Sequence, residues 1–215
     1  MGVLKDEIDA YDAAKREKLP GEVLATMAQC TEELKGAGIE GRALKTGDAM
    51  PNFELPNQHG EQRRLSDYLA ESPLVLNIYR GGWCPYCNME MKALHDVLPE
   101  IESRGVRLVG LSPETPDKAM STAERHAIDI DILSDAGNRI ADQMGLVFEL
   151  PQALRPIYEK VGIDIPAFNG DDSFKLPVPA TYIIGQDGVI VFDFVNADYT
   201  QRLEPSEIVS RLAML

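Results

Sequence analysis

Two cysteines, Cys84 and Cys87, form a C-x-x-C pair and carry the clearest chemical signal in this 215-residue chain. The pair follows the glycines Gly81 and Gly82, which end an apolar run, and the next residues suit a helix that begins near Cys84. A thiol at a helix N-terminus faces unpaired backbone N–H groups and the positive end of the helix dipole, so its thiolate is stabilised. This arrangement predicts thiol redox chemistry in which the two cysteines form a reversible disulfide.

The spacing of apolar residues after the pair predicts different surroundings for the two sulfurs. One set alternates by steps of four and three, as a single buried face of a helix requires: Cys87, Met91, Leu94, Leu98 and Ile101. Cys87 is therefore expected to face the core. Cys84 lies one turn earlier, where we expect its thiol to reach solvent and to attack a partner. Tyr86, between the cysteines, is expected to be exposed.

Other uses of paired cysteines fit the sequence less well. A structural zinc site needs two further ligands, but the chain has no second C-x-x-C and its three histidines are scattered. Covalent haem attachment needs a histidine directly after the second cysteine, and that residue is Asn88. Two inert core cysteines remain the plain alternative. We predict no metal and no cofactor, and we expect Cys30 to be a packed small side chain, with a resolving or intersubunit role as its alternative.

Strand and helix patterns alternate in the chain, which predicts an α/β fold whose central sheet contains parallel pairs and is flanked by helices. Expected strands cover 74–79, 106–111, 130–133, 180–184 and 189–195, and expected helices cover 85–103, 115–126, 138–144 and 205–215. The last two strands flank a Gly-Gln-Asp-Gly turn, which is typical of an antiparallel hairpin. Residues 148–178 are rich in proline and are expected to form an irregular insertion with a short helix near 154–161.

The pattern divides the chain into an N-terminal helical arm, residues 1–45, and one domain, residues 46–215. Pro20 and Gly21 should split the arm into two helices, and the glycines at 36, 38 and 41 should end the second. We expect the arm to cap the domain or to contribute to a homodimer contact.

The overall charge disfavours some partners. A formal net charge of −14 opposes binding to nucleic acid, because such binding needs clustered Lys and Arg. The first residues are acidic where an export signal needs an apolar core, and no apolar run approaches the roughly 20 residues that span a bilayer. These features predict a cytoplasmic protein without a membrane partner.

Two stretches resemble the thioredoxin superfamily. The segment WCPYC, residues 83–87, resembles the redox motif of thioredoxins and glutaredoxins, and LPVPATYIIGQDGVI resembles the later hairpin of that superfamily. In those proteins a cis-proline faces the disulfide, and Pro179 matches that position. The resemblance implies that Trp83 packs beside the disulfide and that Pro85 begins the helix.

The wider chain from residue 46 resembles the peroxiredoxin-like (alkyl hydroperoxide reductase/thiol-specific antioxidant) family. The family motif has a proline, a threonine four residues later, the peroxidatic cysteine three residues after that, and a glutamate three beyond. On this sequence the peroxidatic position is Cys87 and the glutamate is Glu90, but Cys84 replaces the threonine and Arg80 the proline. The resemblance implies a thioredoxin-like fold and reduction of hydroperoxides, with thioredoxin, glutaredoxin or glutathione as reductant.

Three functions therefore stay open on the sequence. In a peroxidase, Cys87 becomes a sulfenic acid and condenses with Cys84. In a thiol-disulfide oxidoreductase, Cys84 attacks a disulfide substrate and Cys87 resolves the product. In a redox sensor, the disulfide alters binding to a partner. Arg80 is expected either to support a thiolate or to be a surface cation.

Overall fold

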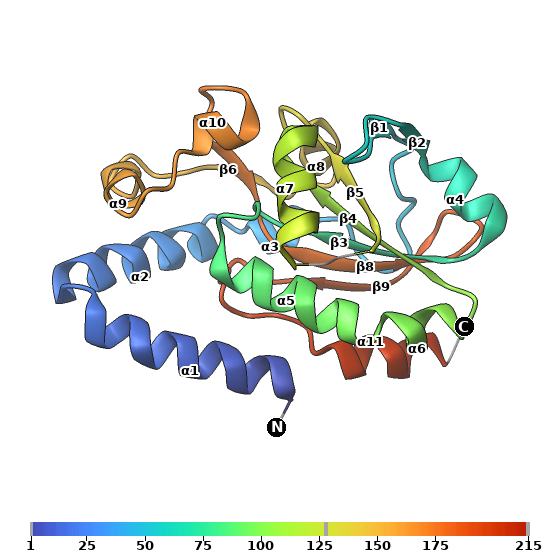
Figure 1. Cartoon of the computed structure of the whole chain (residues 1–215), viewed down its shortest axis with the longest axis horizontal. Coiled ribbons are helices and arrows are strands. Elements are labelled where there is room, and N and C mark those ends of the chain that lie inside the picture. The colour runs from blue at the N-terminus through green and yellow to red at the C-terminus, as the bar shows by residue number, and fades with distance from the viewer. Residues whose placement is uncertain (1, 127–128, 214–215) are drawn as a thin grey trace.

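The computed structural model describes residues 2–126 and 129–213 and contains a central five-stranded sheet with helices on both faces (Figure 1). The strand order is β5-β4-β3-β8-β9, with β3 parallel to β4, β4 parallel to β5, and the other pairs antiparallel. The strands are β3 (Leu74–Ile78), β4 (Arg107–Ser112), β5 (Asp131–Ser134), β8 (Ala180–Ile184) and β9 (Ile190–Val195). The predicted α/β fold and the predicted hairpin are confirmed.

The central strands are buried on both faces, which explains why they read as apolar runs rather than alternating patterns. Every residue of β3 and of β8 is buried. One hydrophobic cluster packs α3 (Ile39–Arg42), α4 (Leu65–Glu71) and α8 (Arg139–Gln143) on one side of the sheet. The other packs α5 (Pro85–Asp96), α6 (Leu98–Glu102), α7 (Pro116–His126) and α11 (Pro205–Leu212).

The helix expected over 85–103 is two helices. α5 ends at Asp96 and α6 begins at Leu98, with Pro99 in its first turn. Proline has no N–H to donate to the preceding turn, so the chain restarts a helix here instead of continuing one. The predicted apolar face persists across the break, since Cys87, Met91 and Leu94 in α5 and Leu98 and Ile101 in α6 are all buried.

The N-terminal arm forms α1 (Val3–Lys18) and α2 (Gly21–Gly36), followed by the short α3. Leu4 and Ile8 of α1 are buried in the same cluster as α5, and Figure 1 shows α1 running alongside that helix. The end of the arm is tied to the domain where Leu44 donates a backbone hydrogen bond to Met144 (3.0 Å). Gly145 has φ +73°, and a Cβ there would lie 2.3 Å from the Arg42 carbonyl oxygen, so this close approach requires glycine.

The segment expected to be an irregular insertion is more regular than the sequence indicated. It contains the antiparallel pair β6 (Val147–Glu149) and β7 (Lys175–Pro177), and the helices α9 (Arg155–Lys160) and α10 (Ile165–Asn169). The expected short helix is present as α9. A second small antiparallel pair, β1 (Glu54–Pro56) and β2 (Gln62–Arg64), precedes α4. Within the described residues, no helix is both long and apolar enough to cross a membrane.

Candidate active site

The two cysteines lie at the junction between β3 and α5, as predicted. Gly81 has φ +138°, and Cys84 caps α5, with Pro85 in the first turn. The backbone N–H of Cys84 donates to the Gly81 carbonyl (3.0 Å), which closes the turn. Gly82 has no room for a side chain, because a Cβ there would lie 2.0 Å from the hydroxyl of Thr122. The two glycines thus allow the strand to turn tightly into the helix.

Both sulfurs are buried, but only Cys84 lines a cavity. Cys84 is 1% exposed and Cys87 is 0% exposed. A cavity of about 410 Å³ has Cys84 in its wall, whereas Cys87 lies behind it and does not line it. The expectation that Cys84 reaches open solvent is therefore wrong, because the arm and the insertion cover this end of the sheet. Of the two cysteines, Cys84 is the one that lines the cavity, while the order in which the two sulfurs react stays a prediction.

The surroundings of the cysteines favour ionisation of Cys84. Burial alone would raise the pKa of Cys84, but a hydrogen bond from the Cys87 thiol and the positive charges of Arg80 and Arg202 lower it to about 6. Burial raises the pKa of Cys87 well above its ordinary value, and the bond to the Cys84 thiolate reinforces that shift. One thiolate and one thiol at neutral pH is the pairing that dithiol redox chemistry needs.

Arg80 is a buried cation beside Cys84 and not a surface residue. It is 2% exposed, and its guanidinium lies 4.8 Å from the ring centre of Trp83 and 4.5 Å from that of Tyr199. It donates a hydrogen bond to the Tyr158 hydroxyl (2.6 Å). Among the described residues it has no carboxylate partner, and its Nε has no hydrogen-bond acceptor. A buried cation without a carboxylate is costly, and the Cys84 thiolate supplies the missing negative charge.

Arg202 is the second cation of the site, and the sequence motifs did not select it. It lies between β9 and α11, donates to Glu90 (2.6 Å) and contacts the Cys87 sulfur at 3.5 Å. Glu90, chosen from the family motif, is thus linked to Cys87 through Arg202. Burial raises the pKa of Glu90 to about 7 although the positive charge of Arg202 opposes that shift. No motif surrounds Arg202 in the sequence that would have revealed it.

Glu114 is a second buried acid that the sequence did not reveal. Its carboxylate accepts a hydrogen bond from the Gly82 N–H (2.9 Å), and the Tyr79 hydroxyl donates to it at 3.3 Å. It therefore holds the glycine turn in place from the end of β4. Burial raises the pKa of Glu114 to about 7, against the opposing effect of these hydrogen bonds.

We expect Glu114 to make stability depend on pH. Its pKa in the folded chain, about 7, exceeds the ordinary 4.5, so the stabilisation from its bound proton is present at low pH and is lost as pH rises through that interval. In Glu114→Gln an amide oxygen still accepts from Gly82 but carries no charge. Urea unfolding should show that, between pH 4.5 and pH 8, the free energy of unfolding of the variant rises by up to about 3 kcal/mol relative to that of the wild type. A difference in free energy of unfolding between the two proteins that does not change with pH would contradict this role of Glu114.

Tyr86 is buried, contrary to expectation, because the arm packs on it. Its ring meets Tyr11 and Tyr199 edge-on, with ring centres 5.3 and 5.4 Å away. Its hydroxyl donates to Asp12 and accepts from Lys15 (2.7 Å). The middle of the redox motif is thus fastened to α1.

The remaining predicted residues divide between the site and the rest of the fold. Trp83 and Pro85 line the same cavity as Cys84. Pro179 was matched to a cis-proline, but the described chain contains no cis peptide bond. The backbone runs extended from β7 into β8, which suits the trans form that X-Pro bonds prefer. Pro179 also does not line the cavity, and Cys30 packs with Leu150 and Leu154 in a separate cluster.

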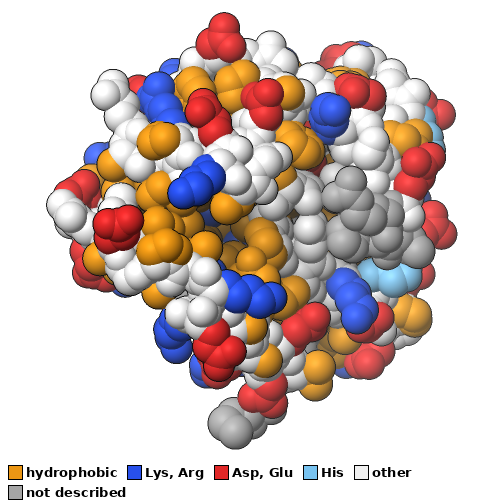
Figure 2. Space-filling view, turned by 60° about the vertical axis from the view of Figure 1, so that its left-hand side comes forward, with side chains coloured by type: hydrophobic (Ala, Val, Ile, Leu, Met, Phe, Trp, Pro, Cys, Tyr) orange, Lys and Arg blue, Asp and Glu red, His pale blue; other side chains and the backbone are white. Residues whose placement is uncertain are grey.

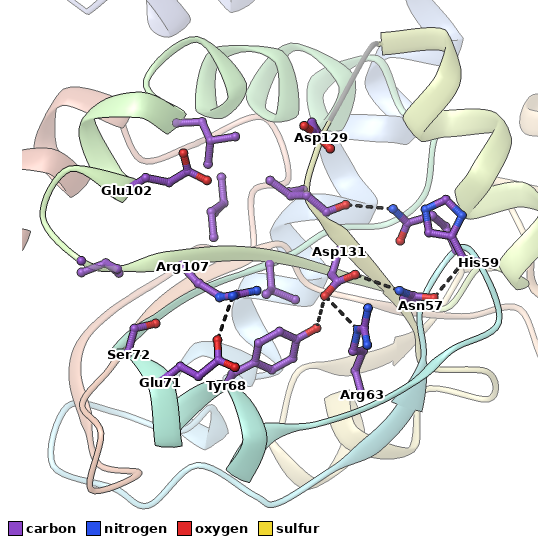
Figure 3. A pocket seen from close by; sticks show the side chains of 17 residues that line it. Asn57, His59, Arg63, Tyr68, Glu71, Ser72, Glu102, Arg107, Asp129 and Asp131 are labelled. Atoms are coloured by element: carbon purple, nitrogen blue, oxygen red, sulfur yellow. Dashed lines mark hydrogen bonds and ion pairs between the residues drawn. The ribbon is translucent and has the colours of Figure 1, made fainter.

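A larger cavity of about 730 Å³ lies elsewhere, between β2, α4 and the starts of β4 and β5, and no cysteine lines it (Figure 3). Its polar groups mainly satisfy one another. Asp131 accepts hydrogen bonds from Asn57, Arg63 and Tyr68, and Arg107 pairs with Glu71. These contacts fasten the β1–β2 pair to the sheet, so this cavity is a structural junction.

Comparison with known proteins shows the family to which the chain belongs. A family model described as "AhpC/TSA family" matches residues 46–193. The chain belongs to the AhpC/TSA family. It is 34% identical over 103 residues to "Peroxiredoxin Bcp" of Escherichia coli (strain K12), an alignment that covers 48% of this chain and 65% of that protein. The chain is also 36% identical over 114 residues to a protein of Mycobacterium tuberculosis (strain CDC 1551 / Oshkosh) whose name includes "peroxiredoxin". That alignment covers 53% of this chain and 74% of that protein.

Solved structures of peroxiredoxins have the same fold. The structure of peroxidoxin BcpB from Mycobacterium tuberculosis has a TM-score of 0.61 and 26% identity, and covers 80% of this chain and 98% of that one. The PrxQ structure from Xylella fastidiosa has a TM-score of 0.61 at 16% identity, covering 80% and 96%. The residues that the AhpC/TSA family model matches include Arg80, Cys84, Cys87 and Glu90. Arg202 and the N-terminal arm lie outside the matched residues.

Proposed function

We propose that the protein is a thiol peroxidase in which Cys84 attacks the hydroperoxide and Cys87 resolves the product. One observation carries the order of the two sulfurs: Cys84 lines the cavity and has a lowered pKa, while Cys87 is sealed behind it with a raised pKa. This order reverses the roles implied by the family motif. Family membership and the fold support peroxide reduction.

The oxidative half-reaction has two steps. The Cys84 thiolate attacks the terminal oxygen of ROOH, the O–O bond breaks, and a proton from the site converts the leaving alkoxide into ROH, so that Cys84 becomes a sulfenic acid. The Cys87 sulfur then attacks the Cys84 sulfur, the S–O bond breaks, and water leaves. The peroxide is reduced by two electrons and the two thiols are oxidised to the Cys84–Cys87 disulfide.

The neighbouring charges suit these steps. Arg80 stabilises the attacking thiolate and faces the cavity in which the O–O bond breaks. Arg202 contacts Cys87 and favours its thiolate when it must resolve the sulfenic acid. Glu90 and Glu114 have pKa values near 7, so both can exchange protons with the buried dithiol at neutral pH.

Two molecules of a thiol, or one dithiol, must then reduce the disulfide. Thioredoxin, glutaredoxin and glutathione all supply this chemistry. Because Cys84 lines the cavity and Cys87 does not, the pair also suits attack on an external disulfide that enters the cavity, so thiol-disulfide exchange is the second candidate function. Cytoplasmic location and a homodimer stay predictions from the sequence.

Single-cysteine variants test the proposal. We expect Cys87→Ser, mixed with hydrogen peroxide in stopped flow, to form a stable sulfenic acid on Cys84, detected by a sulfenate-specific label and mass spectrometry. Cys84→Ser should react at least about 100-fold more slowly, because the Cys87 thiol that it retains at the site is buried and protonated.

Two results would contradict the proposal. Rapid sulfenate formation on Cys87 in Cys84→Ser would restore the order of the family motif. Slow peroxide reactions of both variants, combined with a mixed disulfide trapped on Cys84 from a model disulfide, would favour thiol-disulfide exchange.

A further inference from the structure

The cavity at Cys84 is built largely by the N-terminal arm. Six of its lining residues belong to residues 1–45, and three more, Tyr158, Val161 and Ile163, come from α9 and the loop after it. The arm lies outside the residues that the family model matches. Figure 2 looks onto the side where α1, α2 and α9 lie and shows hydrophobic side chains gathered around a hollow, with Lys and Arg beside it. The arm therefore supplies part of the wall of the cavity that Cys84 lines.

The charge of the cavity wall is opposite to that of the protein. Lys15, Lys18 and Arg80 line it, and apart from the Cys84 thiolate, which faces Arg80, none of the lining residues that the structure describes is acidic, although the chain carries a net charge of −14. Lys15 is partly neutralised by Asp12 at 3.6 Å. Lys18 has no ion-pair partner among the described residues. The wall thus offers an unpaired ammonium group near its rim.

One buried donor on a cavity-lining residue also lacks an acceptor. Arg80 Nε is buried and has no hydrogen-bond partner within the described chain, and Arg80 lines the cavity. The indole Nε1 of Trp83 is likewise unpaired, but it lies against Gly81, where a Cβ would be 2.5 Å away, and Gly81 does not line the cavity. Native proteins rarely leave such groups unpaired, so a reactant with oxygen atoms that lie against Arg80 and Cys84 would suit the Arg80 guanidinium.

The rest of the wall is apolar, with Leu19 and Met27 from the arm and Val161 and Ile163 from the insertion. A cavity of about 410 Å³ admits a small molecule. Its ligand should therefore combine an apolar body with a negative charge at the end remote from the reacting atom.

We propose that the arm makes this cavity a binding site for small amphipathic anions, and that Lys18 selects carboxylate-bearing reactants over neutral ones at Cys84. The inference rests on the proposed function and deepens it. The same chemistry is present in a hydroperoxide that carries a carboxylate on an apolar chain and in a small anionic thiol that reduces the disulfide. The two sources act in different half-reactions, so kinetics can separate them.

The oxidative half-reaction is tested with a medium-chain carboxylic acid hydroperoxide and its methyl ester, which share one carbon skeleton. The fluorescence of Trp83, the single tryptophan, reports oxidation of the neighbouring cysteine. We expect the wild type to react roughly two- to fivefold faster with the acid, and added salt should weaken this preference. Lys18→Glu should abolish or invert it, while Lys92→Glu, an exposed site outside the cavity with the same change of charge, should retain it.

The reductive half-reaction is tested by reducing the preformed disulfide with 3-mercaptopropionate and with its neutral amide, each rate corrected for the pKa of the thiol. A charge preference that Lys18→Glu removes, in either half-reaction, supports the site and identifies which reactant uses it. The inference would be overturned if neither half-reaction showed a charge preference. It would also be overturned if Lys18→Glu and Lys92→Glu changed that preference equally. Reaction of Cys84 with the neutral ester would still leave the peroxidase proposal standing.

Discussion

Arg80→Met should raise the pKa of the Cys84 thiol and slow its reaction with peroxide near neutral pH by roughly 10- to 30-fold. The wild-type pKa of about 6 leaves Cys84 mostly ionised at pH 7. Arg80 is one of two cations that hold it there, and burial raises the pKa as soon as that charge is removed. A pKa near the ordinary cysteine value of about 8.5 leaves roughly 3% thiolate at pH 7, which sets the size of the effect. Methionine occupies the space between the aromatic rings without the charge.

A pH titration of thiolate absorbance and of the peroxide rate checks this expectation. The rates of the two proteins should converge at pH values where both are fully ionised, because the variant changes ionisation more than intrinsic reactivity. Tyr158→Phe is the matched control, since it removes the hydroxyl that accepts from Arg80 but keeps the cation. We expect less than about a threefold change in the control. A variant whose Cys84 still titrates near pH 6 would show that Arg80 is not its counter-ion.

Arg202→Met should lower the free energy of unfolding by about 3–5 kcal/mol near pH 8, because it leaves the buried Glu90 carboxylate without a countercharge. Both side chains of this pair are almost fully buried. The pKa of Glu90 is already raised to about 7 with Arg202 present, and removal of that charge raises it further. The folded variant therefore binds a proton that the unfolded chain releases, and its stability decreases as pH rises. We expect the loss to be clearly smaller near pH 5.5, as urea unfolding of the reduced protein will show.

The double variant Arg202→Met/Glu90→Gln separates charge from packing. It should recover most of the lost stability and lose the added pH dependence, because neither a buried charge nor its partner remains. Equal losses for the single and double variants at both pH values would mean that Arg202 acts through its apolar contacts alone.

The local pattern of the sequence was enough to predict that the two cysteines lie where a buried strand turns into a helix. The buried strand, the Gly81–Gly82 turn and the apolar face after Cys87 each depend on neighbours within a few residues. Strand and helix periodicity, turn glycines and helix capping are local effects. The same reasoning correctly predicted the hairpin of β8 and β9. It was wrong where a proline restarted the helix at Pro99. The match of Pro179 to a cis position, which came from the family resemblance, was also wrong.

The chemical setting of the cysteines was decided by tertiary structure. Arg202 is 115 residues from Cys87 in sequence, and Glu114 is 32 residues from the glycine turn that it holds. The arm that buries Tyr86 and walls the cavity meets the motif across more than 70 residues. No periodicity or spacing encodes such contacts, because they arise only when the sheet brings distant segments together. The sequence by itself was enough to select the two sulfurs that we propose to react. Their ionisation, their order of reaction and the molecules that reach them depend on the charges and cavity walls that folding places around them.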